Sequence, residues 1–257
     1  MKPRVHCTLV VAMAVMIACF STSAAEQIDA ATLKALTTTV EVFAEDVATG
    51  DLEAAALLFD SRERARSRNF PALLAQMHVY ISELGGPEQY RGFAAINEVN
   101  HRGAAAGEVK LLVYNLLLPE KFAQILEGTP YPLDSDSPQE QENNLAEFVA
   151  ALNPDRLSGF TLVELIPLTV SPRPGRDLAF ERRKAYDHIQ GYAECLAIYE
   201  WSGQRFAGGV TMVRYDDAHW RIRSLSSSNR TNYFPHGRLI KVDKDVKIDS
   251  LTTLKEK

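Results

Sequence analysis

The sequence has few of the residues on which disulfide-stapled domains depend. Only three cysteines occur among its 257 residues, and Cys7 and Cys19 both lie near the N-terminus. If that segment is removed, Cys195 is the single thiol and no disulfide can form within the chain. Because free cysteines are usually buried, Cys195 is interpreted as a small apolar side chain in a strand and not as a nucleophile.

Motifs for metals, nucleotides and serine hydrolases are also absent from the sequence. Its histidines stand apart, without H-x-x-x-H or C-x-x-C spacing, which argues against a zinc site. It contains no G-x-x-x-x-G-K loop, no G-x-G-x-x-G turn and no G-x-S-x-G elbow. The net charge of −5 gives no basic footprint for nucleic acid. We therefore expect no metal, no cofactor and no nucleic-acid partner.

Residues 1–25 are interpreted as a signal peptide. Lys2 and Arg4 precede an uncharged, almost wholly apolar run of 13 residues, and small residues precede a cut after Ala25. Removal of this segment takes away two basic residues and no acid, so the net charge falls to −7. The protein is therefore expected to be periplasmic or secreted, in a bacterium.

Two alternatives to plain secretion remain open for this segment. The apolar run is shorter than the roughly 20 residues that span a bilayer, so an uncleaved anchor is the less favoured alternative and no permanent membrane span is expected. Cys19 follows a weak imitation of the site at which bacterial lipoproteins are lipidated. Plain secretion is preferred to both.

The first third of the mature chain has the periodicity of helices. Apolar residues recur at steps of three and four, which places them on one helical face: Leu33, Leu36, Val40, Phe43 and Val47. Gly50 suits the left-handed residue just after a helix, and Asp51 suits the cap of a second helix that runs to about Phe59. A third helix is predicted from Asn69 to Leu84.

The pattern then changes along the chain. Residues 108–118 form an apolar run that fits either a buried strand or a helix, and periodicity leaves both open. Residues 119–154 are interpreted as a helical insertion. Strand-like segments with turn residues between them follow: 160–170, 192–201, 205–215 and 219–226. The last three are predicted to form an antiparallel meander.

The final hairpin of this meander has a predicted register. Asp216 to Ala218 is favoured as the loop, because it pairs Met212 with Ile222 and Arg214 with Trp220, whereas a shorter loop would pair Met212 with an arginine. Trp220, Ile222 and Ser224 then lie on the packed face. Arg221 and Arg223 lie on the face that meets water or an anion.

The segments "TGDLEAAALLF" and "YDDAHWRIRSLS" resemble the entry and exit of the cone-shaped α+β superfamily of nuclear transport factor 2, which includes SnoaL-like enzymes. The resemblance implies an α+β fold in which N-terminal helices pack in the concave face of a bent antiparallel sheet, with a pocket in the cone. One elaborated domain is expected over 26–228, including the helical insertion at 119–154. Residues 229–257 are expected to be an extended arm and a polar tail.

Two groups of residues are candidates for a site. The first is a pocket on the concave face, in which Glu194 would be a buried acid or base. Its residues are Glu194, Leu196, Ile198, Met212 and Trp220. A sheet-edge position in water is the alternative for Glu194, and a one-residue slip would exchange it for Cys195.

The second group is a run of arginines that guanidinium chemistry suits to an anion or an acidic partner. Its members are Arg62, Arg64, Arg66 and Arg68. The alternative is a solvated linker in which these charges pair with nearby acids.

Three functions follow from these features. The preferred one is an exported envelope protein that binds a small molecule or a protein partner through the cone pocket or a sheet face, with no assigned reaction. The second is a metal-independent SnoaL-like isomerase, dehydratase or cyclase that uses a pocket carboxyl. The third is a structural component of an envelope assembly, and an open sheet face also allows a homodimer.

Overall fold

The protein has an α+β fold, described here from a computed structural model. The structure describes residues 28–69, 87–127, 145, 148–150, 152–168, 186–215, 219–228, 233–234 and 236–243. The predicted signal peptide, the helix predicted after Asn69, the hairpin loop 216–218 and most of the insertion lie outside these ranges. The described helices are α2 (Ala30–Thr49), α3 (Leu52–Leu57), α4 (Ser61–Ser67), α6 (Pro87–Leu117), α7 (Pro119–Leu126) and the 3₁₀ turn η2 (Pro154–Leu157). The strands are β1 (Thr161–Pro167), β2 (Gly191–Trp201), β3 (Gln204–Arg214), β4 (Trp220–Ser224), β5 (Ser227–Ser228), β6 (Tyr233–Phe234) and β7 (Leu239–Val242).

The helix α2 ends where the sequence predicts, and its start is capped by Asp29. The Asp29 carboxylate accepts a hydrogen bond from the Thr32 amide, which satisfies one free donor of the first turn. Gly50 ends the helix with φ of 78°, and the Asp51 side chain accepts from the Ala54 amide at the start of α3. The predicted apolar stripe of α2 is buried against the sheet, apart from Leu33 at its start.

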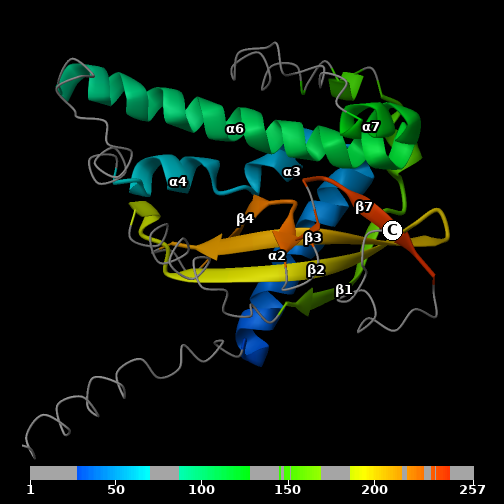
Figure 1. Cartoon of the computed structure of the whole chain (residues 1–257). Helices are drawn as coiled ribbons and strands as arrows, with labels where there is room; N and C mark the ends of the chain where they lie inside the picture. The colour runs from blue at the N-terminus through cyan, green and yellow to red at the C-terminus, as the bar shows by residue number, and fades with distance from the viewer. Residues whose placement is uncertain are drawn as a thin grey trace, which may run out of the picture.

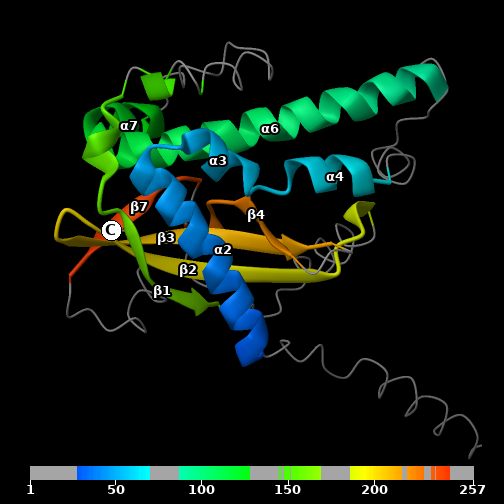
Figure 2. The same ribbon diagram turned by 180° about the vertical axis from the view of Figure 1, so that it is seen from behind.

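The apolar run 108–118, which the sequence left open, is helical. It forms the last third of α6, a helix of 31 residues. Helices α3 and α4 lie along α6 in both views of the molecule, whereas α2 crosses one face of the sheet (Figures 1 and 2). The core therefore lies between this sheet face and the helices, and α4 is held between α6 and the end of the sheet.

The meander β2, β3 and β4 is antiparallel, as predicted. The sheet has five strands in the order β1-β2-β3-β4, with β7 also paired to β3. In the last hairpin Met212 pairs with Ile222 and Arg214 pairs with Trp220, so the predicted register is confirmed. The Trp220 side chain is buried, and the Arg214 guanidinium lies 5.7 Å from the centre of its ring.

The predicted arm contributes the strand β7 to the sheet. Leu239–Val242 pairs with Arg205–Gly208, on the same edge of β3 that β4 occupies further along. Helix α6 holds this segment, because the Asn115 side chain accepts from the Leu239 amide at 2.5 Å. The arm is thus paired to the domain through β7.

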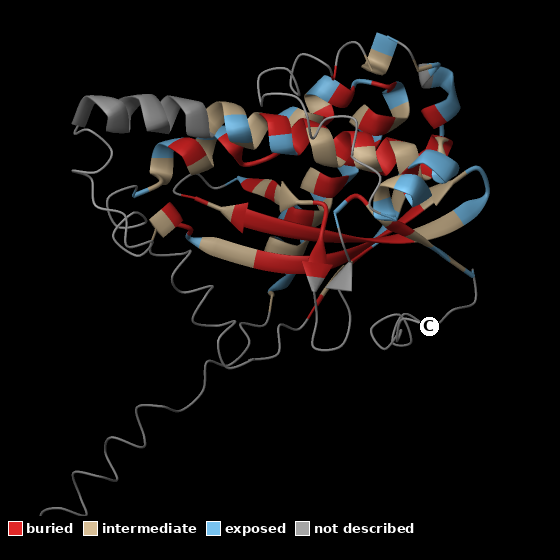
Figure 3. Cartoon of the chain, turned by 45° about the horizontal axis from the view of Figure 1, so that its top comes forward, coloured by how far each residue is buried: buried red, intermediate tan, exposed pale blue. Residues whose placement is uncertain are grey.

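Both faces of the central strands are buried (Figure 3). One face packs against α2 and includes Ala193, Cys195 and Met212. The other face holds a separate cluster that includes Leu196 and Ile198. Within the described ranges, the helices are too short or too polar to cross a membrane.

Candidate functional site

Helix α4 separates the predicted arginine run into two pairs. Arg64 and Arg68 are four residues apart and partly buried, whereas Arg62 and Arg66 are exposed. A spacing of two residues turns a helical side chain by about 200°, so the two pairs lie on different sides of α4. The sequence grouped these four residues as one site, but the structure brings only Arg64 and Arg68 into a cluster.

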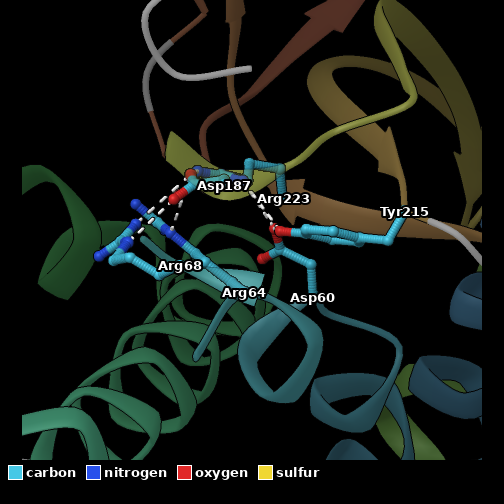
Figure 4. Close-up of polar contacts among 6 residues, drawn as sticks. All are labelled: Asp60, Arg64, Arg68, Asp187, Tyr215 and Arg223. Atoms are coloured by element: carbon cyan, nitrogen blue, oxygen red, sulfur yellow. Dashed lines mark hydrogen bonds and ion pairs between the residues drawn. The ribbon is translucent and has the colours of Figure 1, made fainter. Parts of the chain in front are cut away.

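Asp187 is the acid to which these two arginines point (Figure 4). It lies just before β2 and is almost fully buried. The Arg68 Nε donates to its Oδ1 at 2.9 Å, and the Arg223 Nη2 donates to its Oδ2. Arg64 approaches less closely, with its Nε 3.9 Å from Oδ2.

A β-bulge in the pairing of β3 with β4 leaves Arg223 without a paired residue on β3. Thr211 pairs with Ser224 and Met212 with Ile222, so Arg223 has no register partner between them. Bulges often redirect a side chain in this way. The Arg223 Nη1 donates to Asp60 Oδ2 at 2.9 Å, so the Arg223 guanidinium joins the two buried acids.

Asp60 lies just before α4, and its Oδ2 accepts a hydrogen bond from Tyr215 in addition to the one from Arg223. The Tyr215 hydroxyl donates to Asp60 Oδ2 at 2.8 Å. We define the polar cluster as Asp60, Arg64, Arg68, Asp187, Tyr215 and Arg223, the residues drawn in Figure 4. The neighbouring Arg221 pairs with Glu63 at 3.3 Å, so the two arginines that were expected to meet water or an anion both meet carboxylates of this region.

The two acids of the polar cluster respond differently to burial. Burial raises the pKa of Asp60, and the nearby Arg223 offsets this only in part. Burial acts in the same direction on Asp187, but the hydrogen bonds and charges of Arg68 and Arg223 outweigh it and lower its pKa. Burial and the neighbouring Asp60 raise the pKa of Tyr215, so its hydroxyl remains protonated at neutral pH.

Positive charge is in excess in the polar cluster. Three guanidiniums meet two carboxylates, which leaves one positive charge uncompensated among the described residues when both acids are ionised. Arg64 is the least closely paired of the three, because its Nε lies 3.9 Å from Asp187, and burial and the charge of Arg223 lower its pKa to about 10. In the described part of the chain, its buried Nε has no hydrogen-bond partner.

His101 on α6 is the neighbouring titratable group. Burial, followed by the charges of Arg64, Arg68 and Arg223, lowers its pKa to about 3, so the ring is neutral at physiological pH. Its buried Nε2 also has no hydrogen-bond partner among the described residues. Arg64 of the polar cluster and the neighbouring His101 thus each carry a buried nitrogen without a hydrogen-bond partner among the described residues, beside an excess of positive charge, a combination that suits an anion.

The predicted pocket is not assembled as expected. Ala193 pairs with Met212 and Glu194 pairs with Thr211, so Glu194 lies on the opposite sheet face from Met212. Leu196 and Ile198 share the face of Glu194, whereas Trp220 packs in the core with Met212.

The buried apolar side chains on both faces explain this difference. In a strand with one exposed face, apolar and polar residues alternate and show which side chains point to the core, but a strand buried on both faces has no such alternation. Glu194 is buried and accepts from the Tyr192 hydroxyl at 2.6 Å. Cys195 takes the core-facing position, and burial raises its pKa to about 12.

Sequence reasoning did not identify Asp60, His101 or Asp187 as site residues. Asp60 followed by Glu63 is a start signal for a helix, and it would have shown that the arginine run is helical. No local pattern marks His101 or Asp187. No group of three or more metal-binding side chains is arranged to hold an ion in the described ranges.

Comparisons with known proteins give no family for this chain. No protein-family model and no curated protein matches it. Among solved structures, it is similar to a cystatin-like protein from Ruminococcus gnavus ATCC 29149, with 18% sequence identity and a TM-score of 0.41. The alignment covers 86% of this chain and 44% of that one, so this chain spans less than half the length of that protein. A likeness at this level assigns neither a family nor a function.

Proposed function

We propose that this protein is an exported, bacterial binding protein of the cone-shaped α+β type, and that it binds a small anion at the polar cluster. The observation that carries the proposal is the excess of one positive charge among the described residues of the polar cluster, in which Arg64 is the least closely paired arginine. A guanidinium that burial and like charges disfavour gains most from a bound anion, because the anion supplies the missing counter-charge.

Solvent access also points to Arg64 as the residue that meets the ligand. Its side chain is 28% exposed, compared with 11% for Arg68 and 10% for Arg223. Asp60 and Asp187 lie deeper, at 3% and 4%. Arg64 is therefore the arginine of the polar cluster that solvent reaches most, and the one that we expect an anion to meet first.

A binding role is preferred to catalysis because the expected pocket acid is not in the cone. Side chains of α2 and of the strands fill that sheet face, and Glu194 lies on the other one. Asp60 is the buried carboxyl whose pKa is raised, so it is the better candidate for an enzymatic alternative. Its side chain is 3% exposed and its Oδ2 already accepts two hydrogen bonds, which ranks this alternative second.

The test compares two arginines of the same helix. Purified mature protein, residues 26–257, is titrated separately with acetate and with inorganic phosphate, and thermal unfolding and calorimetric binding are measured. An anion at about 100 times its dissociation constant should stabilise the wild type by about 2.7 kcal/mol. Arg64→Ala should abolish this effect, whereas Arg66→Ala, which removes an outward-facing guanidinium of the same charge, should retain it.

Two results would contradict the proposed site. Equal losses of anion binding in Arg64→Ala and Arg66→Ala would show that binding depends only on the overall charge of the protein. Absence of binding in the wild type for both anions would reject the anion-binding function. Export is tested separately by the mass of the mature N-terminus, where an intact Met1 would argue against cleavage after Ala25.

A further inference from the structure

Helices α4 and α6 pack together, and each carries a buried nitrogen without a hydrogen-bond partner among the described residues. Helix α4 packs along α6, and Arg64 is the charge that acts most strongly on His101. The Arg64 Nε and the His101 Nε2 are both buried, and neither has a hydrogen-bond partner in the described ranges. Buried polar atoms without partners are uncommon, and a missing ligand is one explanation for a pair of them.

We propose that the anion is a monoanionic carboxylate that lies between Arg64 and His101, and that the bound anion lets His101 take up a proton on acidification, at a higher pH than in the free protein. This inference rests on the proposed function and adds the ligand class and its regulation. One carboxylate oxygen would accept from the guanidinium and the other from the imidazolium. At neutral pH, where His101 is uncharged, a single negative charge matches the single positive charge left uncompensated among the described residues of the polar cluster.

Charge explains why proton uptake and anion binding are coupled. Among the described residues, the charges that act most on His101 in the free protein are Arg64 on α4, Arg68 just after α4, Arg223 on β4 and the opposing acid Asp187. On its own helix, Glu98 and Arg102 lie 3.9 Å apart and pair with each other. An anion beside the ring would cancel the nearest positive charge and add an acceptor for an imidazolium proton.

The coupling is reciprocal by thermodynamic linkage. If the anion favours protonated His101, a lower pH must favour the anion by the same factor. Starting from a pKa of about 3, a rise of about two units in the bound state would tighten anion binding about tenfold between about pH 7 and pH 4. Binding should therefore strengthen on acidification, which is a regulatory property suited to a compartment whose pH varies.

Trifluoroacetate is a suitable probe because this carboxylate stays ionised over the whole range. Its binding to the mature protein is measured by fluorine NMR from pH 7 to pH 4, and histidine ring nitrogens are followed by nitrogen NMR in the same samples. We expect the His101 ring to stay neutral down to about pH 4 without the probe and to protonate at a higher pH with it. Dissociation constants should fall about tenfold over this range.

Variants separate this inference from the proposed function. His101→Gln should bind the probe with a nearly flat pH profile, whereas His236→Gln, a matched change at an exposed histidine, should keep the wild-type slope. Binding that depends on Arg64 but leaves the His101 ring neutral would overturn the proton coupling alone. Absence of probe binding in a protein that still binds phosphate through Arg64 would overturn the carboxylate inference alone. Probe binding that is unchanged in Arg64→Ala would overturn both proposals.

Discussion

Asp187 offers the sharpest test of the polar cluster as a structural unit. Its side chain is 4% exposed and accepts from Arg68 and Arg223, so Asp187→Ala leaves two buried guanidiniums without this partner and raises the positive excess from one charge to two. Removal of one partner from a buried ion pair typically costs about 3–5 kcal/mol. Because Asp60 still pairs with Arg223, we expect the lower end of this range, about 3 kcal/mol at pH 7.

The pH dependence has a definite sign. The folded-state pKa of Asp187 is lowered from its usual value of 3.8, so its stabilising effect is fully present above that value and is lost as the pH falls through the folded pKa. Urea unfolding followed by tryptophan fluorescence should show a large difference between wild type and Asp187→Ala at pH 7. The difference should shrink below about pH 3.8.

An acid on the surface provides the matched control. Asp243→Ala removes an exposed carboxylate after β7 and should change the free energy of unfolding by less than about 0.5 kcal/mol. A loss below about 1 kcal/mol in Asp187→Ala at pH 7 would refute the reasoning, because it would show that the arginines relax into water. A loss that is the same at pH 7 and pH 3 would refute its electrostatic origin.

Three further predictions concern other parts of the molecule. A Cβ at Gly191 would stand 2.8 Å from the Trp220 ring, so Gly191→Ala should destabilise the fold by about 1–3 kcal/mol and shift tryptophan emission. Tyr199→Phe removes a buried hydroxyl without a partner in the described residues and should leave unfolding unchanged or raise its free energy by about 1 kcal/mol; a clear loss would contradict this. A hydrogen bond to Glu108 raises the pKa of His236, so this pair should stabilise the fold below pH 6.5 and lose its effect at higher pH. In urea unfolding, His236→Gln should therefore show a free energy of unfolding that depends less on pH than that of the wild type.

The features predicted correctly are those that neighbouring residues decide. The α2 stripe, its left-handed end at Gly50 and the Asp51 cap each depend on a few consecutive residues. The register of Met212 with Ile222 was also predictable, because a shift by one residue would have buried an arginine. Local periodicity and the residue types at turns are therefore sufficient to predict these elements.

The sequence could not show which residues of β2 point to α2 and which point to the other sheet face, and the reason is physical. Every residue from Ala193 to Tyr199 is buried, so alternation does not distinguish the face that packs on α2 from the other. Glu194 was placed in the pocket on chemical grounds, and β7 was taken for an arm because four residues give too weak a strand signal.

The candidate site was mostly beyond sequence reasoning. Its arginines on α4 were visible as a group, but Asp60 and Arg223 are 163 residues apart in the chain and meet only through the β4 bulge. Asp187 and Tyr215 are likewise joined to the polar cluster by tertiary packing alone. Such contacts leave no spacing pattern in a single sequence.

The division of one β3 edge between β4 and β7 has a practical consequence for anyone who shortens this protein. A fragment that stops at residue 228, the boundary suggested by composition, would leave the backbone of Arg205–Gly208 paired with β2 on one side and bare on the side that β7 covers. Bare edges of this kind invite pairing between molecules. Shortened versions should therefore keep the chain through at least residue 243, and a product that ends earlier is expected to precipitate or form dimers through that gap.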